Sequence, residues 1–271
     1  MFTHRHLDIN VRHGESYMKI RNPKSRFDLK IGRNDFVLDV GGGSNPHYRA
    51  NVVIDRYLSN NTHRGDNLKI LGNQHLIIAD GMFLPLKDKT FEYVLSSHAL
   101  EHVENPSVFL SELSRVGKRG YIETPSLIGE YLIPKKSHRW AILEIDEKIV
   151  LIEKKIIGLN PPFDFGDLLQ KYVMKNSIEF NIFKRTNPNL FTVRYEWKDE
   201  IDNVVNPDDE KLLSFFVHSW DEKKILKIVP KKSKFDMIAS FLLGFTELIF
   251  DYFKYIIRQA VPKLKAIVQI K

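Results

Sequence analysis

The chain has 271 residues, of which 43% are hydrophobic and 28% are charged, so it can build a packed core and is not globally disordered. It contains no cysteine, which excludes disulfide frameworks, thiolate nucleophiles and cysteine-ligated metal centres. The net charge is +7, and residues 230–271 carry most of it, with eight lysines and arginines against three acids. Because the rest is nearly neutral, we expect no nucleic-acid groove across the main body.

The N-terminal segment, residues 1–35, is polar and contains several histidines and arginines. It has no apolar stretch of the kind that a secretory signal requires. Together with the absence of cysteine, this indicates a cytoplasmic protein. We expect an irregular lead-in with a short helix near residues 16–24.

Five short apolar runs follow, and each is typical of a buried strand. They are "FVLDV" (36–40), "NVVID" (51–55), "HLIIAD" (75–80), "FEYVLSS" (91–97) and "GYIET" (120–124). Between the last two, "NPSVFLSELSRV" predicts a helix with Asn105 as its cap and Pro106 at its first position. Apolar strands alternating with crossovers indicate an α/β fold with a Rossmann-like, doubly wound and mostly parallel sheet.

The first crossover is unusually short, since only eight residues separate Gly43 from Val52. Parallel strands are normally joined by ten or more residues. Eight extended residues reach about 26 Å, which suffices to cross back along a short strand. We therefore expect a loop or a single turn here rather than a full helix.

The pattern changes after Pro125. Residues 139–155 alternate apolar and polar side chains around "DE", which predicts a β-hairpin. A helix is predicted within 164–176. The runs "FTVRYEW" (191–197) and "ILKIV" (225–229) are strand candidates for an antiparallel edge of the same sheet.

Polar residues and glycines stand at the carboxyl ends of the predicted strands, where open α/β sheets bind their ligands. The candidates are Asp39, Gly41, Gly42, Gly43, Asp55, Arg56, Asp80, Gly81, Met82, Ser97 and His98. Asp55 can accept both hydroxyls of a ribose, and Asp80 can accept an exocyclic amine of a base. Gly81 and Met82 would supply a backbone N–H and an apolar face. These residues predict one shared nucleoside-binding cleft.

Residues 33–126 resemble the class I S-adenosylmethionine-dependent methyltransferases, and among them the type 11 small-molecule group. The motifs are "VLDVGGGSNP", "VVIDR", "IIADGMFLPLKDKTFEYVLSSHALEHVENP" and "GYIETPS", of which the third is the most specific. The resemblance implies S-adenosylmethionine as cofactor. It places Asp39 and the glycine loop at the methionine part, Asp55 at the ribose, and Asp80 with Met82 at the adenine. "SSHALEH" would face the sulfonium and the acceptor.

One position departs from the family's pattern, because the third loop glycine is replaced by Asn45, which Pro46 follows. Two other classes of protein therefore stay open. A NAD or nucleotide-sugar enzyme on the same fold is one alternative, although Asp55 comes only fourteen residues after Gly41, closer than the dinucleotide pattern requires. The other is a non-catalytic module that keeps the fold and recruits a partner or a membrane.

Methyl transfer to oxygen or nitrogen can use a base, and histidine titrates near neutral pH. His98, at a strand end, is the first candidate, and His138, in "KKSHRW", is the second. We predict no metal site, because His98 and His102 share a helix face only if one helix includes both, and the spacing specifies no third ligand. The acceptor is expected to be a small molecule, a glycan or a lipid-linked molecule that is methylated on oxygen.

Residues 235–268 are very apolar, but their longest uncharged run has ten residues, 237–246, which is too short to span a bilayer. The charges from Asp236 to Arg258 fall on one helical face, which predicts an amphipathic helix. Such a helix fits the inner face of an anionic membrane, and equally well the domain itself or a second copy in a homodimer.

Three parts are therefore expected along the chain. Residues 1–35 form the lead-in, and 36–229 form the methyltransferase domain, with a substrate-side insertion at about 127–205. Residues 230–271 form the basic amphipathic tail.

Overall fold

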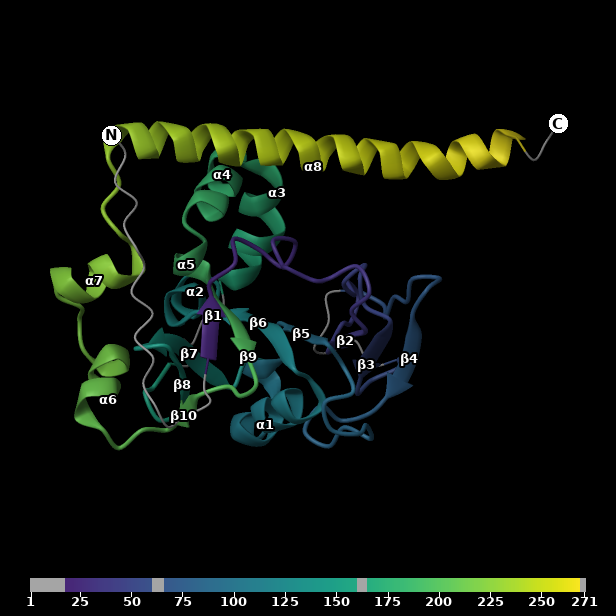
Figure 1. The fold of residues 1–271 in the computed structure, drawn as a ribbon. Coiled ribbons are helices and arrows are strands. Elements are labelled where there is room, and N and C mark those ends of the chain that lie inside the picture. Colours follow the sequence, from purple (N-terminus) through teal and green to yellow (C-terminus); the bar gives the residue numbers. More distant parts are fainter. Residues whose placement is uncertain (1–17, 60–65, 160–164, 269–271) are drawn as a thin grey trace, which may run out of the picture.

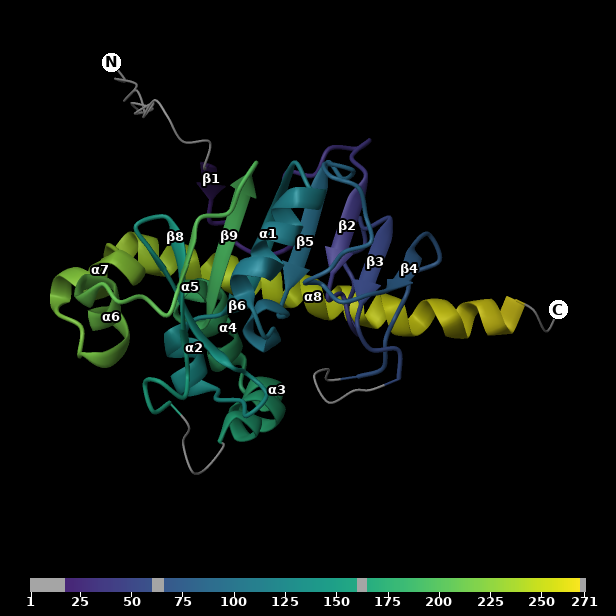
Figure 2. The same cartoon turned by 90° about the horizontal axis from the view of Figure 1, so that it is seen from below.

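A seven-stranded sheet runs through the described residues, which are 18–59, 66–159 and 165–268 of this computed structural model. Its strands lie side by side in the order β1-β9-β6-β5-β2-β3-β4 (Figure 2). Their bounds are β1 Met18–Arg21, β2 Val37–Val40, β3 Val52–Asp55, β4 His75–Ile78, β5 Tyr93–Ser97, β6 Arg119–Pro125 and β9 Thr192–Lys198. Strands β2 to β6 are parallel, and β9 is antiparallel to both β6 and β1. The predicted Rossmann-like sheet with an antiparallel edge is confirmed.

Both faces of this sheet are covered, and for that reason the central strands consist of apolar runs. Strands β2 and β3 are buried at every residue. On one face, Val37, Tyr93 and Tyr121 pack with Leu29 and Ile31 from the segment before β2. Helix α1 covers the other face.

Helix α1 spans Pro106–Val116, as predicted, and the Asn105 side chain accepts a hydrogen bond from the backbone N–H of Val108. The short helix η1, Leu100–His102, precedes it. Within the described residues, α1 is the only α-helix in a crossover between parallel strands. The β2–β3 connection is a loop, as its length predicts.

A smaller sheet stands beside the large one. Strands β7 (Trp140–Ile145) and β8 (Lys148–Glu153) form the predicted hairpin, and β10 (Asn203–Val205) pairs with β8 in parallel. Its outer side chains pack with helices α6 (Glu210–Val217) and α7 (Glu222–Ile228).

Two predicted elements are wrong. Residues 18–21 form strand β1 instead of a helix, because the outer edge of β9 offers hydrogen bonds to an extended segment. Residues 225–229 belong mostly to α7 instead of a strand. The Asp221 side chain caps α7 by accepting from the backbone N–H of Lys224, and this local bond favours the helix.

The remaining helices gather on one side of the sheet and include the predicted helix within 164–176. They are α2 (Leu127–Leu132), η2 (Leu168–Val173), α3 (Met174–Asn176), α4 (Ile178–Thr186) and α5 (Pro188–Phe191). The tail is the predicted helix, α8 (Lys234–Val268), which lies along the molecule with α4 beneath it (Figure 1). None of the helices described here is both long enough and apolar enough to cross a membrane.

Candidate active site

The predicted nucleoside-binding residues meet in one pocket, here called the cofactor pocket. It is lined by Gly41, Asp55, Arg56, Asp80, Gly81 and Met82 together with His98, Ala99, His102 and Phe109. They come from the carboxyl ends of β2, β3, β4 and β5 and from α1. The parallel register brings these strand ends to one edge of the sheet, as expected.

Two carboxylates are fixed in this pocket. Asp55 accepts a hydrogen bond from the backbone N–H of Tyr57 at 2.9 Å. Asp80 accepts one from the backbone N–H of Met82 at 2.9 Å and forms an ion pair with Arg56 at 3.2 Å. Both acids are therefore oriented before any ligand arrives.

The glycine loop brings its backbone close to the β5–α1 connection. Gly41 has a φ of +76°, and a Cβ there would lie 2.7 Å from the Cβ of Ala99. Asp39 lies buried behind the loop and accepts the backbone N–H of His47 at 2.7 Å, with Arg26 at 3.7 Å. Burial raises the pKa of Asp39, and Arg26 opposes that shift.

Four of the predicted cofactor residues do not line the cofactor pocket itself. They are Asp39, Gly42, Gly43 and Ser97. Asp39 supports the loop from behind through the contact with His47. A Cβ on Gly42 would lie 2.8 Å from Val53, so the loop packs directly on β3.

A second and larger cavity, here called the acceptor pocket, adjoins the first. Its volume is 510 Å³, and it shares His98 and His102 with the cofactor pocket. Five basic residues line it: Lys24, Lys135, Lys184, Arg185 and Arg194. Glu101 and Glu123 are the two acids in its wall. Burial lowers the pKa of both Lys184 and Arg194, so part of the basic wall is poorly hydrated.

The cofactor pocket alone holds 140 Å³, which is below the range of roughly 300 to 1,000 Å³ that complete ligand sites occupy. A nucleoside-containing ligand of ordinary size would therefore extend past His98 toward the acceptor pocket.

His98 stands at the junction of the two pockets with a φ of +56°. Its Nδ1 lies 3.5 Å from Glu101 and its Nε2 lies 3.2 Å from Glu123. Burial disfavours the charged ring, but the two carboxylates outweigh this effect and raise the pKa of His98 above its usual value. A histidine that keeps its proton near neutral pH is poorly suited to the predicted role of base.

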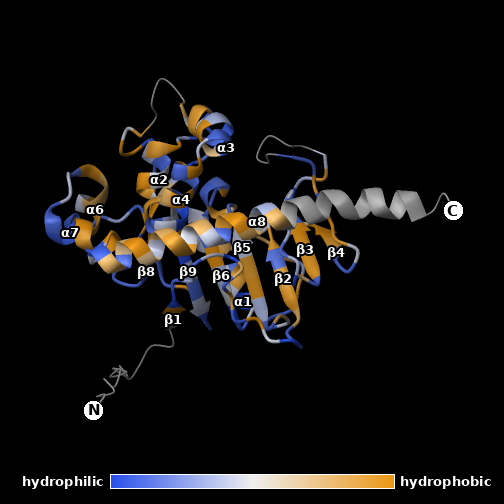
Figure 3. Cartoon of the chain, turned by 90° about the horizontal axis from the view of Figure 1, so that it is seen from above, coloured by the Kyte–Doolittle hydropathy of each residue, from blue (hydrophilic) through white to orange (hydrophobic). Residues whose placement is uncertain are grey.

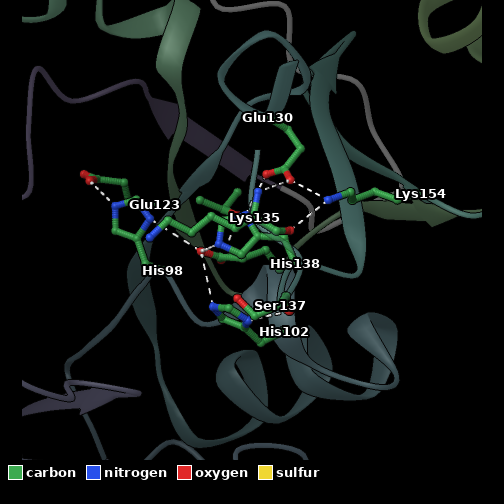
Figure 4. Close-up of polar contacts among 10 residues, drawn as sticks. His98, His102, Glu123, Glu130, Lys135, Ser137, His138 and Lys154 are labelled. Atoms are coloured by element: carbon green, nitrogen blue, oxygen red, sulfur yellow. Dashed lines mark hydrogen bonds and ion pairs between the residues drawn. The ribbon is translucent and has the colours of Figure 1, made fainter. Parts of the chain in front are cut away.

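His102 and His138 also line the acceptor pocket, and their side chains are more buried than that of His98. Figure 4 shows the three rings and their polar contacts. The Nδ1 of His102 lies 2.9 Å from the carbonyl oxygen of Ser137. The Nδ1 of His138 lies 2.6 Å from Glu130, which also pairs with Lys154 at 2.6 Å. These contacts fix the orientation of both rings.

His98 and His138 are the two predicted candidate bases and lie 40 residues apart in the chain. The structure brings both to one cavity. Three residues of this cavity were not predicted as site residues: Glu101, Lys184 and Arg194. Glu101 lies inside the motif "HALEH" and could have been found there. Lys184 and Arg194 come from α4 and β9, and no local motif marks them.

Comparison with known proteins agrees with this geometry. Residues 38–122 match the family model described as a methyltransferase domain. The resemblance drawn from the motifs is confirmed. This segment is a class I methyltransferase domain of the type 11 group, and S-adenosylmethionine is its cofactor.

Two curated relatives match parts of the chain. A malonyl-[acyl-carrier protein] O-methyltransferase of Marinomonas sp. is 29% identical over 45% of this chain and 48% of its own length. An uncharacterized protein of Methanocaldococcus jannaschii is 39% identical over 22% of this chain and 33% of its own length. The chain therefore spans about half of the first relative and a third of the second.

Among solved structures, a putative methyltransferase in complex with the Haloferax volcanii Trm112 activator gives a TM-score of 0.36 at 14% identity, over 64% of this chain and 86% of its own. The YcgJ protein of Bacillus gives a TM-score of 0.31 at 14% identity, over 60% of this chain and 88% of its own.

The residues of the cofactor pocket fit S-adenosylmethionine. Asp55 and Asp80 offer carboxylate oxygens to hydroxyl and amine donors, and Met82 with Phe109 forms an apolar wall for a planar base. At Gly41 a Cβ would clash with Ala99, so glycine lets the loop lie against the β5–α1 connection.

Proposed function

We propose that the protein transfers a methyl group from S-adenosylmethionine to an oxygen atom of a small, negatively charged acceptor. The observation that carries this proposal is the junction of the two pockets at His98 and His102. A donor held in the cofactor pocket would face an acceptor held in the acceptor pocket.

When bound, S-adenosylmethionine supplies a methyl group that is already activated by its positive sulfur. The chain's own contribution is then to align the acceptor and to exclude water. The carboxylates of Asp55 and Asp80 orient the donor, and the walls of the acceptor pocket orient the oxygen that receives the methyl group.

The charge of the acceptor follows from the basic wall. Lys184 and Arg194 lie where burial lowers their pKa, so an anionic ligand would stabilise their charged forms. Within the described residues, the Nε of Arg194 is buried without a hydrogen-bond partner. A carboxylate or phosphate suits such a wall. The relative named as a malonyl-[acyl-carrier protein] O-methyltransferase supports oxygen as the accepting atom.

The tail extends the proposal to an acceptor carried by a lipid at an anionic membrane surface. Large apolar side chains of α8 are exposed: Phe235, Ile238, Phe241, Leu242 and Leu243. Hydrophobic colouring recurs along the described part of this helix (Figure 3). Lysines 231, 232 and 234 stand at the start of the helix, where they would meet anionic headgroups. Helix α4 packs on α8 and contributes Lys184 to the acceptor pocket, so a membrane on α8 would lie near that pocket.

Two measurements test the proposal. The melting temperature should rise with S-adenosylhomocysteine and not with NAD, because a ligand stabilises the fold that binds it. Cell extract incubated with the protein and a labelled methyl donor should then carry label in an acidic lipid or small-molecule fraction. Stabilisation by NAD alone would favour the dinucleotide alternative. Cofactor binding without any labelled product would favour the recruitment module.

A further inference from the structure

A buried carboxylate oxygen in the acceptor pocket lacks a hydrogen bond. Glu101 is 1% exposed, and its Oε2 accepts the hydroxyl of Thr124 at 3.0 Å. Within the described residues, Oε1 has no hydrogen-bond partner. A carboxylate oxygen buried this deeply is costly unless positive charge lies close to it, and here the nearest positive group is the His98 ring, which forms an ion pair with Oε1 and no hydrogen bond.

Imidazole nitrogens surround this oxygen at distances too long for hydrogen bonds. The Nε2 of His138 lies 3.9 Å from Oε1 and the Nε2 of His102 lies 4.0 Å away. The Nδ1 of His98 lies 3.5 Å away, at the mouth of the group. The three atoms contributed by Glu101, His102 and His138 lie within 4.8 Å of one another.

The outer contacts decide which ring nitrogens carry protons. The Nδ1 atoms of His102 and His138 face a carbonyl oxygen and the Glu130 carboxylate, and both of these groups accept hydrogen bonds. Both Nδ1 atoms therefore donate, and in the neutral rings both Nε2 atoms present lone pairs toward Glu101. Metal-ligating histidines typically show this pattern, in which the second nitrogen donates to a carbonyl or a carboxylate.

We propose that Glu101, His102 and His138 bind a first-row divalent metal ion of the zinc type. Two imidazoles and one carboxylate match the ligands of open, catalytic sites for such ions, whereas Mg²⁺ prefers oxygen ligands alone. Ligand atoms around tetrahedral zinc lie about 3.4 Å apart. The two distances to Glu101 must therefore shorten by roughly half an ångström, and the widest pair of ligand atoms, which lie within 4.8 Å of each other, by up to about 1.4 Å, which side-chain rotations can supply. The sequence did not favour this site, since His138 joins it only through the fold.

The inference rests on the proposed function and deepens it. Glu101, His102 and His138 all line the acceptor pocket, so a metal ion held by them would supply Lewis acidity there and would ease the loss of the acceptor's proton to water. The oxygen then forms the new bond to the methyl carbon as the carbon–sulfur bond breaks. The electron pair stays on sulfur, which becomes neutral as S-adenosylhomocysteine leaves. His138 acts here as a ligand and not as a base.

The test is calorimetric titration of the chelator-treated full chain with ZnCl₂. Histidines 4, 6 and 13 are changed to asparagine in every sample, because they form a separate candidate for zinc binding. We expect one bound ion per chain and at least a hundredfold weaker binding in Glu101→Gln. Glu130→Gln should weaken binding by about ten- to a hundredfold, because it orients His138 without being a ligand.

The matched control is His75→Asn, an exposed histidine on β4, which should bind zinc as the parent does. Circular dichroism without metal shows whether each variant folds, and the visible spectrum with Co²⁺ reports the ligand set independently. Equal zinc binding in the parent and in Glu101→Gln, or no binding in either, overturns the site.

Cofactor binding separates the two proposals. If the methyltransferase proposal holds and the metal proposal fails, S-adenosylhomocysteine binds and methyl transfer is unaffected by chelator. If the methyltransferase proposal fails, S-adenosylhomocysteine does not bind, whatever the metal content.

Discussion

The cofactor pocket and the acceptor pocket adjoin, yet they are built in different ways. Every lining residue of the cofactor pocket lies between Val40 and Phe109, mostly just after a strand. The lining of the acceptor pocket begins at Lys24 and ends at Arg194. One pocket is encoded by a single run of sequence, and the other is assembled by folding.

The two pockets also differ in charge. The cofactor pocket offers Asp55 and Asp80 with one ion-paired arginine, whereas the acceptor pocket has five basic residues against two acids. The difference fits a donor held by its hydroxyls and amines and an acceptor held by its negative charge. A substitution of a residue that lines only one pocket should therefore leave binding in the other unchanged, whereas His98 and His102 line both.

The largest expected effect concerns the support of the glycine loop. His47 is 2% exposed, its Nδ1 accepts from the backbone N–H of Arg49, and its Nε2 faces the carbonyl of Arg26. Burial and the nearby Arg26 lower the pKa of His47 to about 4. The unfolded chain binds this proton near pH 6.5. The free energy of unfolding should therefore fall by about 3 kcal/mol in total as the pH drops from 6.5 to 4.

Chemical denaturation at several pH values measures this effect. His47→Gln removes the titrating ring, so its unfolding free energy should change less between pH 7 and pH 5 than that of the parent. Carboxylates contribute equally to both proteins and cancel in the difference. If the unfolding free energies of the two proteins changed with pH in parallel, folding would not lower the pKa of His47, and the prediction would be wrong.

A smaller effect is expected in the cofactor pocket. Asp55→Asn keeps the size of the side chain and removes its charge, so hydrogen bonds to a ligand hydroxyl lose about 2 kcal/mol. The affinity for S-adenosylhomocysteine, measured by calorimetry, should fall about thirtyfold. Asp66→Asn, an exposed acid, is the matched control. Unchanged affinity in Asp55→Asn would remove the ribose assignment.

This contrast explains how much the sequence could predict. The parallel strands were predictable because each is a contiguous apolar run, and the cofactor residues follow them directly. Strand β1 could not be predicted in this way, since its four residues become a strand only by pairing with β9, far along the chain. The meeting of His138 with Glu101 likewise depends on tertiary contacts, because the backbone N–H of Arg139 donates to the carbonyl oxygen of Glu101 and so holds the segment before β7 against η1. Local patterns do not record such packing.

In the acceptor pocket we expect a smaller change that leaves the cofactor untouched. Lys184→Gln removes one partly buried positive charge and should raise the KM for an anionic acceptor about tenfold. The affinity for S-adenosylhomocysteine should stay the same. Lys198→Gln, exposed at the end of β9, serves as the control. Loss of cofactor affinity in Lys184→Gln would mean that the two pockets are not independent.

The smallest effect concerns α8, whose two sides should behave differently. Leu242→Ser, on the exposed side, should leave the melting temperature unchanged and weaken binding to anionic vesicles about fivefold. Gly244→Val is the contrast, because a Cβ there would lie 3.0 Å from Thr186 of α4. It should disturb α4 and raise the KM for the acceptor without changing cofactor affinity. If Leu242→Ser leaves vesicle binding intact and instead converts a dimer to a monomer in solution, a second copy of the chain covers α8 and the membrane proposal fails.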